Sequence, residues 1–223
     1  MRMADTVFLD FEGEGPKGPD RVPQLPFLAG LYRPKARGRK SQFAVSLFRE
    51  HCTPVKNGIP EISEITTLEA FIERISEQAE TENLTICYWS KHELDVLKEF
   101  LKSNPSLIER FEAISLNILP KARKHLRRLG QEPPESGNKV LNHYLAMICP
   151  KAALVSTPRV GAAVSCQRLE RYSDKEKKWS NWSEQQKITA TDLIRYNRED
   201  CIATFRIAQK VLKAKRPRIR RGD

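Results

Sequence analysis

Asp10 and Glu12 stand two residues apart at the end of an apolar segment, Thr6–Phe11, that is rich in strand-forming residues. Because side chains alternate across a β-strand, both carboxylates point to the same face of it. Two carboxylates held together repel each other unless a cation or a shared proton relieves the repulsion. The pair is therefore a candidate metal site, although two solvated charges at a strand end would give the same pattern.

A further candidate carboxylate follows the apolar segment Leu84–Trp89, in a helix predicted for His92–Lys102, where Glu93 and Asp95 compete. At about 100° per residue, Glu93 falls on the apolar face of this helix and Asp95 falls on the charged face. An inward carboxylate is costly unless it is paired or bound to a metal, and the start of a helix favours negative charge. We choose Glu93 as the candidate ligand and interpret Asp95 as a surface charge, and the choice stays open to test.

The last predicted helix, Thr189–Lys213, carries Asp200 on its apolar side, one turn after Tyr196. Residues four apart stack on one helix face, so the phenol and the carboxylate are expected to face the same place. The alternative is an aspartate paired with an arginine in the core, which the other candidate carboxylates make less favourable. A site of four carboxylates without His or Cys is all oxygen, and such a site suits Mg²⁺ or Mn²⁺.

The elements that must position these residues form an α/β pattern, with strands first, then alternation, then helices. We predict a mixed sheet of about five strands, the first three antiparallel, flanked by helices. The predicted strands are Thr6–Phe11, Pro26–Tyr32, Gln42–Phe48, Leu84–Trp89 and Ile114–Ile118. The predicted helices are Thr67–Gln78, His92–Lys102, a basic helix that ends near Leu129, Val140–Ile148, Ala162–Tyr172 and Thr189–Lys213.

The chain of 223 residues is long enough for one domain of ordinary size. We expect a single domain over residues 1–212 and a basic tail without stable structure over residues 213–223. The basic segment Arg33–Lys40 lies between two predicted strands, and we interpret it as the tip of a long hairpin.

Composition favours an anionic partner. Lys and Arg outnumber Asp and Glu by 39 to 28, which gives a formal net charge of +11. Such a chain attracts polyanions, either nucleic acid or an anionic membrane. Arg33–Lys40, Lys121–Arg128 and the C-terminal tail are candidate phosphate contacts, although each is equally explained as a solvated face.

No apolar stretch approaches the roughly 20 residues that span a bilayer, and no signal-peptide layout begins the chain. Five scattered cysteines without a C-x-x-C pair argue against structural zinc. We therefore expect a cytoplasmic protein that binds nucleic acid and no membrane.

Three segments in this order resemble the motifs of the DEDD exonuclease superfamily: Phe8–Glu12 (FLDFE), Tyr88–Leu97 (YWSKHELDVL) and Tyr196–Asp200 (YNRED). The closing Tyr-x-x-x-Asp is similar to the tyrosine branch of that superfamily. The combination is most similar to the bacterial YprB-like predicted exonucleases, whose second motif can carry Glu followed four residues later by an apolar residue. The resemblance runs from about Thr6 to Leu212 and is weak between Gly130 and Lys187.

The resemblance implies an RNase H-like domain and a 3′–5′ exonuclease that hydrolyses phosphodiester bonds of DNA or RNA with two divalent metal ions. It implies that Asp10 bridges the two metals, that Glu12, Glu93 and Asp200 complete their shells, and that Tyr196 orients the attacking water. It also implies a helicase or another repair or processing protein as a partner. A structure-specific endonuclease on the same site, or a catalytically weak nucleic-acid-binding subunit of a larger complex, is the alternative.

Overall fold

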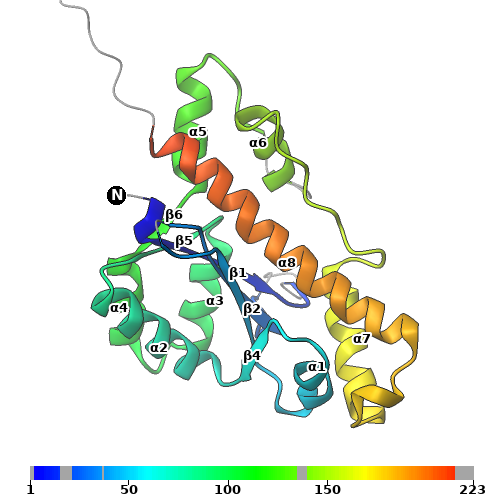
Figure 1. The fold of residues 1–223 in the computed structure, drawn as a ribbon. Helices are drawn as coiled ribbons and strands as arrows, with labels where there is room; N and C mark the ends of the chain where they lie inside the picture. The colour runs from blue at the N-terminus through cyan, green and yellow to red at the C-terminus, as the bar shows by residue number, and fades with distance from the viewer. Residues whose placement is uncertain (1–2, 16–21, 37, 135–139, 214–223) are drawn as a thin grey trace, which may run out of the picture.

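A computed structural model describes residues 3–15, 22–36, 38–134 and 140–213 of the chain. One six-stranded sheet has the order β4-β3-β2-β1-β5-β6 (Figure 1). β1, β2 and β3 pair antiparallel, β5 and β6 run parallel to β1, and β4 runs parallel to β3. The predicted α/β class and the antiparallel first three strands are confirmed, and the arrangement is consistent with an RNase H-like fold. The strands are β1 (Thr6–Glu12), β2 (Leu28–Arg33), β3 (Gln42–Leu47), β4 (Ile62–Ile65), β5 (Thr85–Tyr88) and β6 (Ser115–Asn117).

The sheet has one strand more than the five predicted, because β4 was not expected from the sequence. β4 has only four residues, and two of them, Ser63 and Glu64, are polar. It pairs with β3 alone, at the edge of the sheet, and the register shifts at Val45 and Ser46. Short, polar, irregular edge strands resist pairing with other chains, and they leave little apolar alternation in the sequence.

The described helices agree with the prediction for the second half of the chain and add two that were missed, α1 and α4. Asn104 and Pro105 end one predicted helix, and they also begin α4, since the Asn104 side chain accepts a hydrogen bond from the Leu107 amide. α8 begins earlier than predicted because Ser183 and Gln186 form a capping box. The helices are α1 (Thr53–Gly58), α2 (Leu68–Thr81), α3 (His92–Phe100), α4 (Pro105–Ile114), α5 (Leu119–Arg128), α6 (Val140–Ile148), α7 (Ala162–Lys175) and α8 (Glu184–Val211).

The hairpin predicted at Arg33–Lys40 is present, because Arg33 of β2 pairs with Gln42 of β3. The basic tail lies outside the described residues over 214–223, so its expected lack of structure stays a prediction. In the described part of the chain, every helix is too short or too polar to span a bilayer.

The two faces of β1 belong to different layers of the molecule. Leu9 and Phe11 pack into a core with α2, α3 and α4, whereas Phe8 packs into a core with α5, α6 and α8. Figure 1 shows the long α8 crossing the sheet, with α2, α3 and α4 grouped away from it. Because side chains alternate along the strand, Asp10 and Glu12 share the α8 side with Phe8.

The carboxyl ends of the parallel strands β1, β5 and β6 meet at one edge of the sheet. Glu12 ends β1 at this edge, α3 begins shortly after β5, and α5 begins shortly after β6. The topology therefore brings three separated segments of the chain to the same edge. Ligand sites of α/β sheets lie at such carboxyl edges.

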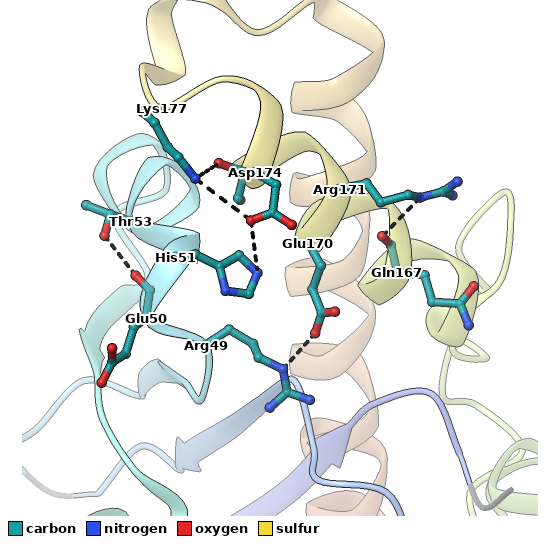
Figure 2. Close-up of polar contacts among 10 residues, drawn as sticks. Arg49, Glu50, His51, Thr53, Gln167, Glu170, Arg171, Asp174 and Lys177 are labelled. Atoms are coloured by element: carbon teal, nitrogen blue, oxygen red, sulfur yellow. Dashed lines mark hydrogen bonds and ion pairs between the residues drawn. The ribbon is translucent and has the colours of Figure 1, made fainter.

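The Arg49 side chain connects α7 to backbone segments beside the sheet (Figure 2). Its Nε donates to Glu170 Oε1 of α7 at 2.7 Å. The rest of the guanidinium donates to the backbone carbonyls of Leu25, Pro26 and Phe48 at 3.1–3.3 Å. One side chain therefore joins α7, the segment that enters β2 and the end of β3.

We expect Arg49→Ala to lower the free energy of unfolding by roughly 2 kcal/mol, since hydrogen bonds to charged groups contribute about 1.5–3 kcal/mol. Glu170→Ala should cost less, because it removes the ion pair and leaves the bonds from Arg49 to the three carbonyls. Urea denaturation of the two variants measures the difference. Equal losses for both would contradict a role of Arg49 in holding the backbone.

Candidate metal centre

Three carboxylates from β1 and α8 form a tight group. Asp10, Glu12 and Asp200 each place one oxygen so that the three oxygens lie within 4.8 Å of one another. Glu12 and Asp200 are each only 8% exposed. The two ends of the chain, 190 residues apart between Asp10 and Asp200, therefore meet in one acidic cluster.

Glu93 lies in the first turn of α3 and is 3% exposed. It lines the same cavity of about 610 Å³ as the three carboxylates, but it lies outside their closest group. The Ser90 amide and hydroxyl both donate to Glu93 Oε2 at 3.3 Å. In contrast, the Asp95 side chain is 37% exposed and pairs with Lys91 at 3.2 Å. The predicted burial of Glu93 and exposure of Asp95 are confirmed, and the role of Glu93 as a ligand stays a prediction.

Tyr196 is half-buried, one turn before Asp200 on α8, and lines the same cavity. Its phenol lies close enough to the Asp200 carboxylate for each group to shift the pKa of the other. Burial, followed by the charges of Asp200, Glu12 and Asp10, raises the pKa of Tyr196 above its ordinary value. The phenol therefore stays protonated and can donate a hydrogen bond. All five residues proposed from the sequence thus line one cavity.

The carboxyl groups of the cluster hold their protons more tightly than free carboxyls do. Burial and then the nearby Glu12, Asp200 and Glu93 raise the pKa of Asp10 well above its usual value. Burial and the charge of Asp200 do the same to the pKa of Glu12. Burial raises the pKa of Glu93 and of Asp200 to about 7 each, and for Asp200 the nearby Tyr196 phenol opposes the rise.

No Lys, Arg or His in the described part of the chain lies within ion-pair distance of these four carboxylates. The alternative of Asp200 paired with a core arginine is therefore not what this part of the structure shows. Buried like charges without a protein cation need protons or metal ions to be stable. The all-oxygen donor set fits hard divalent cations such as Mg²⁺ and Mn²⁺.

One residue of the site, Asn197, was not predicted from the sequence. Its side chain is fully buried, and its Nδ2 donates to Asp10 Oδ2 at 2.7 Å and to the Asp10 carbonyl at 3.2 Å. The nearby amide also lowers the pKa of the Glu12 carboxyl, against the larger effect of burial. Asn197 therefore holds the Asp-x-Glu pair of β1 from α8. The signal was present, since residue 197 lies four after the buried Leu193 on one helix face.

Gly30 of β2 makes room for this amide. Gly30 pairs with Asp10 in the antiparallel register of β1 and β2. A Cβ atom at position 30 would lie 1.7 Å from Asn197 Oδ1, and this oxygen is buried without a hydrogen-bond partner among the described residues. The Cys201 thiol also approaches the Gly30 carbonyl, at 3.6 Å. α8 therefore lies directly on the backbone of β2 at this position.

Part of the lining of the cavity is apolar. It includes Val140 and Leu141 of α6, Val155 of the following loop, and Trp89 directly after β5. Trp89 also packs edge-on against Tyr144. Tyr88, the last residue of β5, is buried and stacks on Phe111.

Two basic side chains also line the cavity. Burial lowers the pKa of His92, so this imidazole is neutral at pH 7. The other is Arg123 of α5, whose Nε donates to the Tyr144 hydroxyl at 3.4 Å. Of these two, only Arg123 brings a positive charge to the wall.

No family model matches the chain, and no curated protein is significantly similar to it.

We expect Gly30→Ala to destabilise the protein by about 1–3 kcal/mol, since overpacking at a tight contact costs that much. Asn197→Ala removes the atom nearest to the new methyl group. The double variant should therefore lose less stability than the sum of the single losses, with a coupling of about 1 kcal/mol. Chemical denaturation of all four proteins measures this coupling, and additive losses would contradict the contact.

The raised pKa values give the metal-free protein a defined pH dependence. The folded state binds the protons of Glu93 and Asp200 up to pH values of about 7, whereas ordinary carboxyls release them near pH 4. The contribution of these groups to stability is therefore lost as pH rises from about 4 through about 7. In chelator, Asp10→Asn should raise the melting temperature at pH 8 by several degrees, since about 1 kcal/mol corresponds to roughly 2–4 °C in a domain of this size.

Asp95→Asn is the matched control and should leave the melting temperature nearly unchanged. Mn²⁺ should raise the melting temperature of the unmodified protein more at pH 8 than at pH 5, because protons compete with the metal. Differential scanning fluorimetry measures both effects. A metal effect independent of pH, or a loss of stability in Asp10→Asn, would contradict the charge repulsion.

Proposed function

We propose that this protein is a metal-dependent nuclease that hydrolyses phosphodiester bonds of nucleic acid with two divalent cations, Mg²⁺ or Mn²⁺, and acts as a 3′–5′ exonuclease. The observation that carries the proposal is that four carboxylates line one cavity and that, within the described part of the chain, no Lys, Arg or His lies within ion-pair distance of them. Asp10, Glu12 and Asp200 form the tight group, and Glu93 lines the same cavity. The order and spacing of the three sequence motifs favour the same activity.

When bound, two such cations stabilise negative charge on the phosphate and the leaving oxygen and lower the pKa of a bound water. Asp10, Glu12, Glu93 and Asp200 are the residues that would hold them. Tyr196 keeps its proton, so it acts as a hydrogen-bond donor that orients the attacking water and not as a base. The exonuclease polarity rests on the resemblance of the motifs, and the cationic chain supports an anionic polymer as substrate.

We expect purified protein to cleave an end-labelled oligonucleotide with Mg²⁺ or Mn²⁺ and to be inactive in chelator. Asp10→Ala and Asp200→Ala should each lower the rate by about a thousandfold or more, which corresponds to roughly 4 kcal/mol of lost transition-state stabilisation. Single-stranded DNA, duplex DNA and RNA labelled at the 5′ end are the substrates. Inactivity of the unmodified protein on all three with both metals would contradict the proposal.

A matched pair of variants tests whether Glu93 or Asp95 is the fourth carboxylate of the site. Glu93→Gln should abolish cleavage, whereas Asp95→Asn, two residues away on the exposed side of α3, should retain it. The product pattern separates the two modes of cleavage. A ladder that shortens from the 3′ end supports the exonuclease, and early internal fragments from a strand with blocked ends support an endonuclease.

A further inference from the structure

α5 carries a concentrated positive charge beside the candidate metal centre. Five of its ten residues are Lys or Arg. Arg123, Lys124, Arg127 and Arg128 line a second hollow of about 580 Å³ together with Pro120. These positions are spaced by three or four residues, so they form one stripe along the helix, which we call the α5 stripe.

The α5 stripe is continuous with the cavity of the carboxylates. Arg123 lines both hollows, and Leu119 at the start of α5 lines the cavity. This follows from the topology, because α5 begins where β6 ends, at the edge of the sheet that also holds Glu12. From there the stripe leads away from the carboxylates toward Arg128.

The charges of the stripe have no carboxylate partner in the described part of the chain. None of its four cations lies within ion-pair distance of a carboxylate there. Arg33, Arg49 and Arg110, in contrast, each pair with a glutamate. Lys124, Arg127 and Arg128 are exposed, and like charges spaced by three or four residues weaken a helix. An anionic polymer laid along the stripe would relieve this repulsion.

The other basic segments are less suited to guide a substrate to the cavity. The hairpin tip after Arg33 lies beyond the amino end of β1, since Tyr32 pairs with Phe8, and Glu12 at the opposite end pairs with Leu28. Two basic side chains of this hairpin also have partners within the protein, because Arg33 pairs with Glu82 and Arg39 donates to the Ala4 carbonyl. The C-terminal tail lies outside the described residues.

We propose that the phosphodiester backbone of the substrate runs along the α5 stripe, with Arg123 at the junction with the cavity and Lys124, Arg127 and Arg128 contacting the phosphates farther from the cleaved bond. The proposal rests on the proposed nuclease function. The nine residues from Pro120 to Arg128 are separated by eight steps, which span about 12 Å at the helical rise of about 1.5 Å per residue. That length corresponds to roughly three phosphates at the helical rise of about 3.4 Å per nucleotide of a strand.

Binding without catalysis tests the strand path separately from the nuclease activity. The assay measures fluorescence anisotropy of a labelled 12-nucleotide single strand, and of the matching duplex, in chelator over a range of NaCl concentrations. The test variant is Lys124→Ala/Arg127→Ala/Arg128→Ala. The control is Lys56→Ala/Arg171→Ala/Lys175→Ala, which removes the same three charges from exposed positions on α1 and α7. Figure 1 shows α5 and α7 near opposite ends of α8.

We expect the test variant to bind the strand roughly tenfold to a hundredfold more weakly at about 50 mM salt, with a salt slope lower by about 2, since each lost phosphate contact of a single strand removes about 0.7. The control should bind within about threefold of the unmodified protein, because salt screens the effect of charges that lie away from the bound strand. Lys124→Arg/Arg127→Lys/Arg128→Lys keeps the charge and should restore binding. Alanine is a good helix former, and circular dichroism verifies that α5 folds in each variant.

Equal losses in the test and control variants would overturn the strand path, because net charge alone would then explain binding. Unchanged binding in the test variant would overturn it as well, and so would a failure of the unmodified protein to bind either nucleic acid. These outcomes leave the nuclease proposal standing wherever metal-dependent cleavage is observed. Charge-dependent binding along α5 without cleavage in the presence of either metal would contradict the nuclease proposal and support the binding surface.

Discussion

The candidate metal centre depends on one close contact, between Asn197 of α8 and the backbone of β1 and β2. The absence of a side chain at Gly30 lets the buried amide lie on β2, and from there it donates to the Asp10 side chain and carbonyl. Asp200 follows Asn197 by three residues on the same helix, so the contact also sets how near its carboxylate comes to β1. A rigid helix transmits this placement, and the two cores on either side of β1 keep the strand in position.

This contact holds together groups that repel one another. Burial and mutual charge raise the pKa values of Asp10 and Glu12, and no cation in the described part of the chain compensates them. The apolar packing around β1, α3 and α8 must therefore supply the free energy that keeps the carboxylates close. A site of this kind lowers the free energy of unfolding of the whole protein. Any cation that binds between the carboxylates raises it again.

The sequence predicts the frame of this arrangement well and its close contacts poorly. Alternation in Thr6–Phe11 and helical spacing around Glu93 were enough to assign the inward and outward carboxylates, because periodicity depends on local geometry alone. β4 and α4 were missed, since a short polar edge strand and a Pro that begins a helix leave no strong periodic signal. Asn197 and Gly30 were missed for a different reason. Helical spacing places Asn197 on the buried face of α8, but its role, like that of Gly30, arises only from the tertiary contact between α8 and β2.

The distribution of charge follows one electrostatic requirement of the proposed reaction. A phosphodiester is an anion, so four ionised carboxylates alone would repel it from the cavity. Two divalent cations carry four positive charges and would neutralise the four carboxylates, so binding of metal and of substrate should favour each other. Positive charge on α5 acts outside the cavity, where metal ions would not reach, and Arg123 lines both hollows. A basic surface beside an acidic centre therefore suits the proposed reaction, since the basic surface attracts the phosphates that the carboxylates repel.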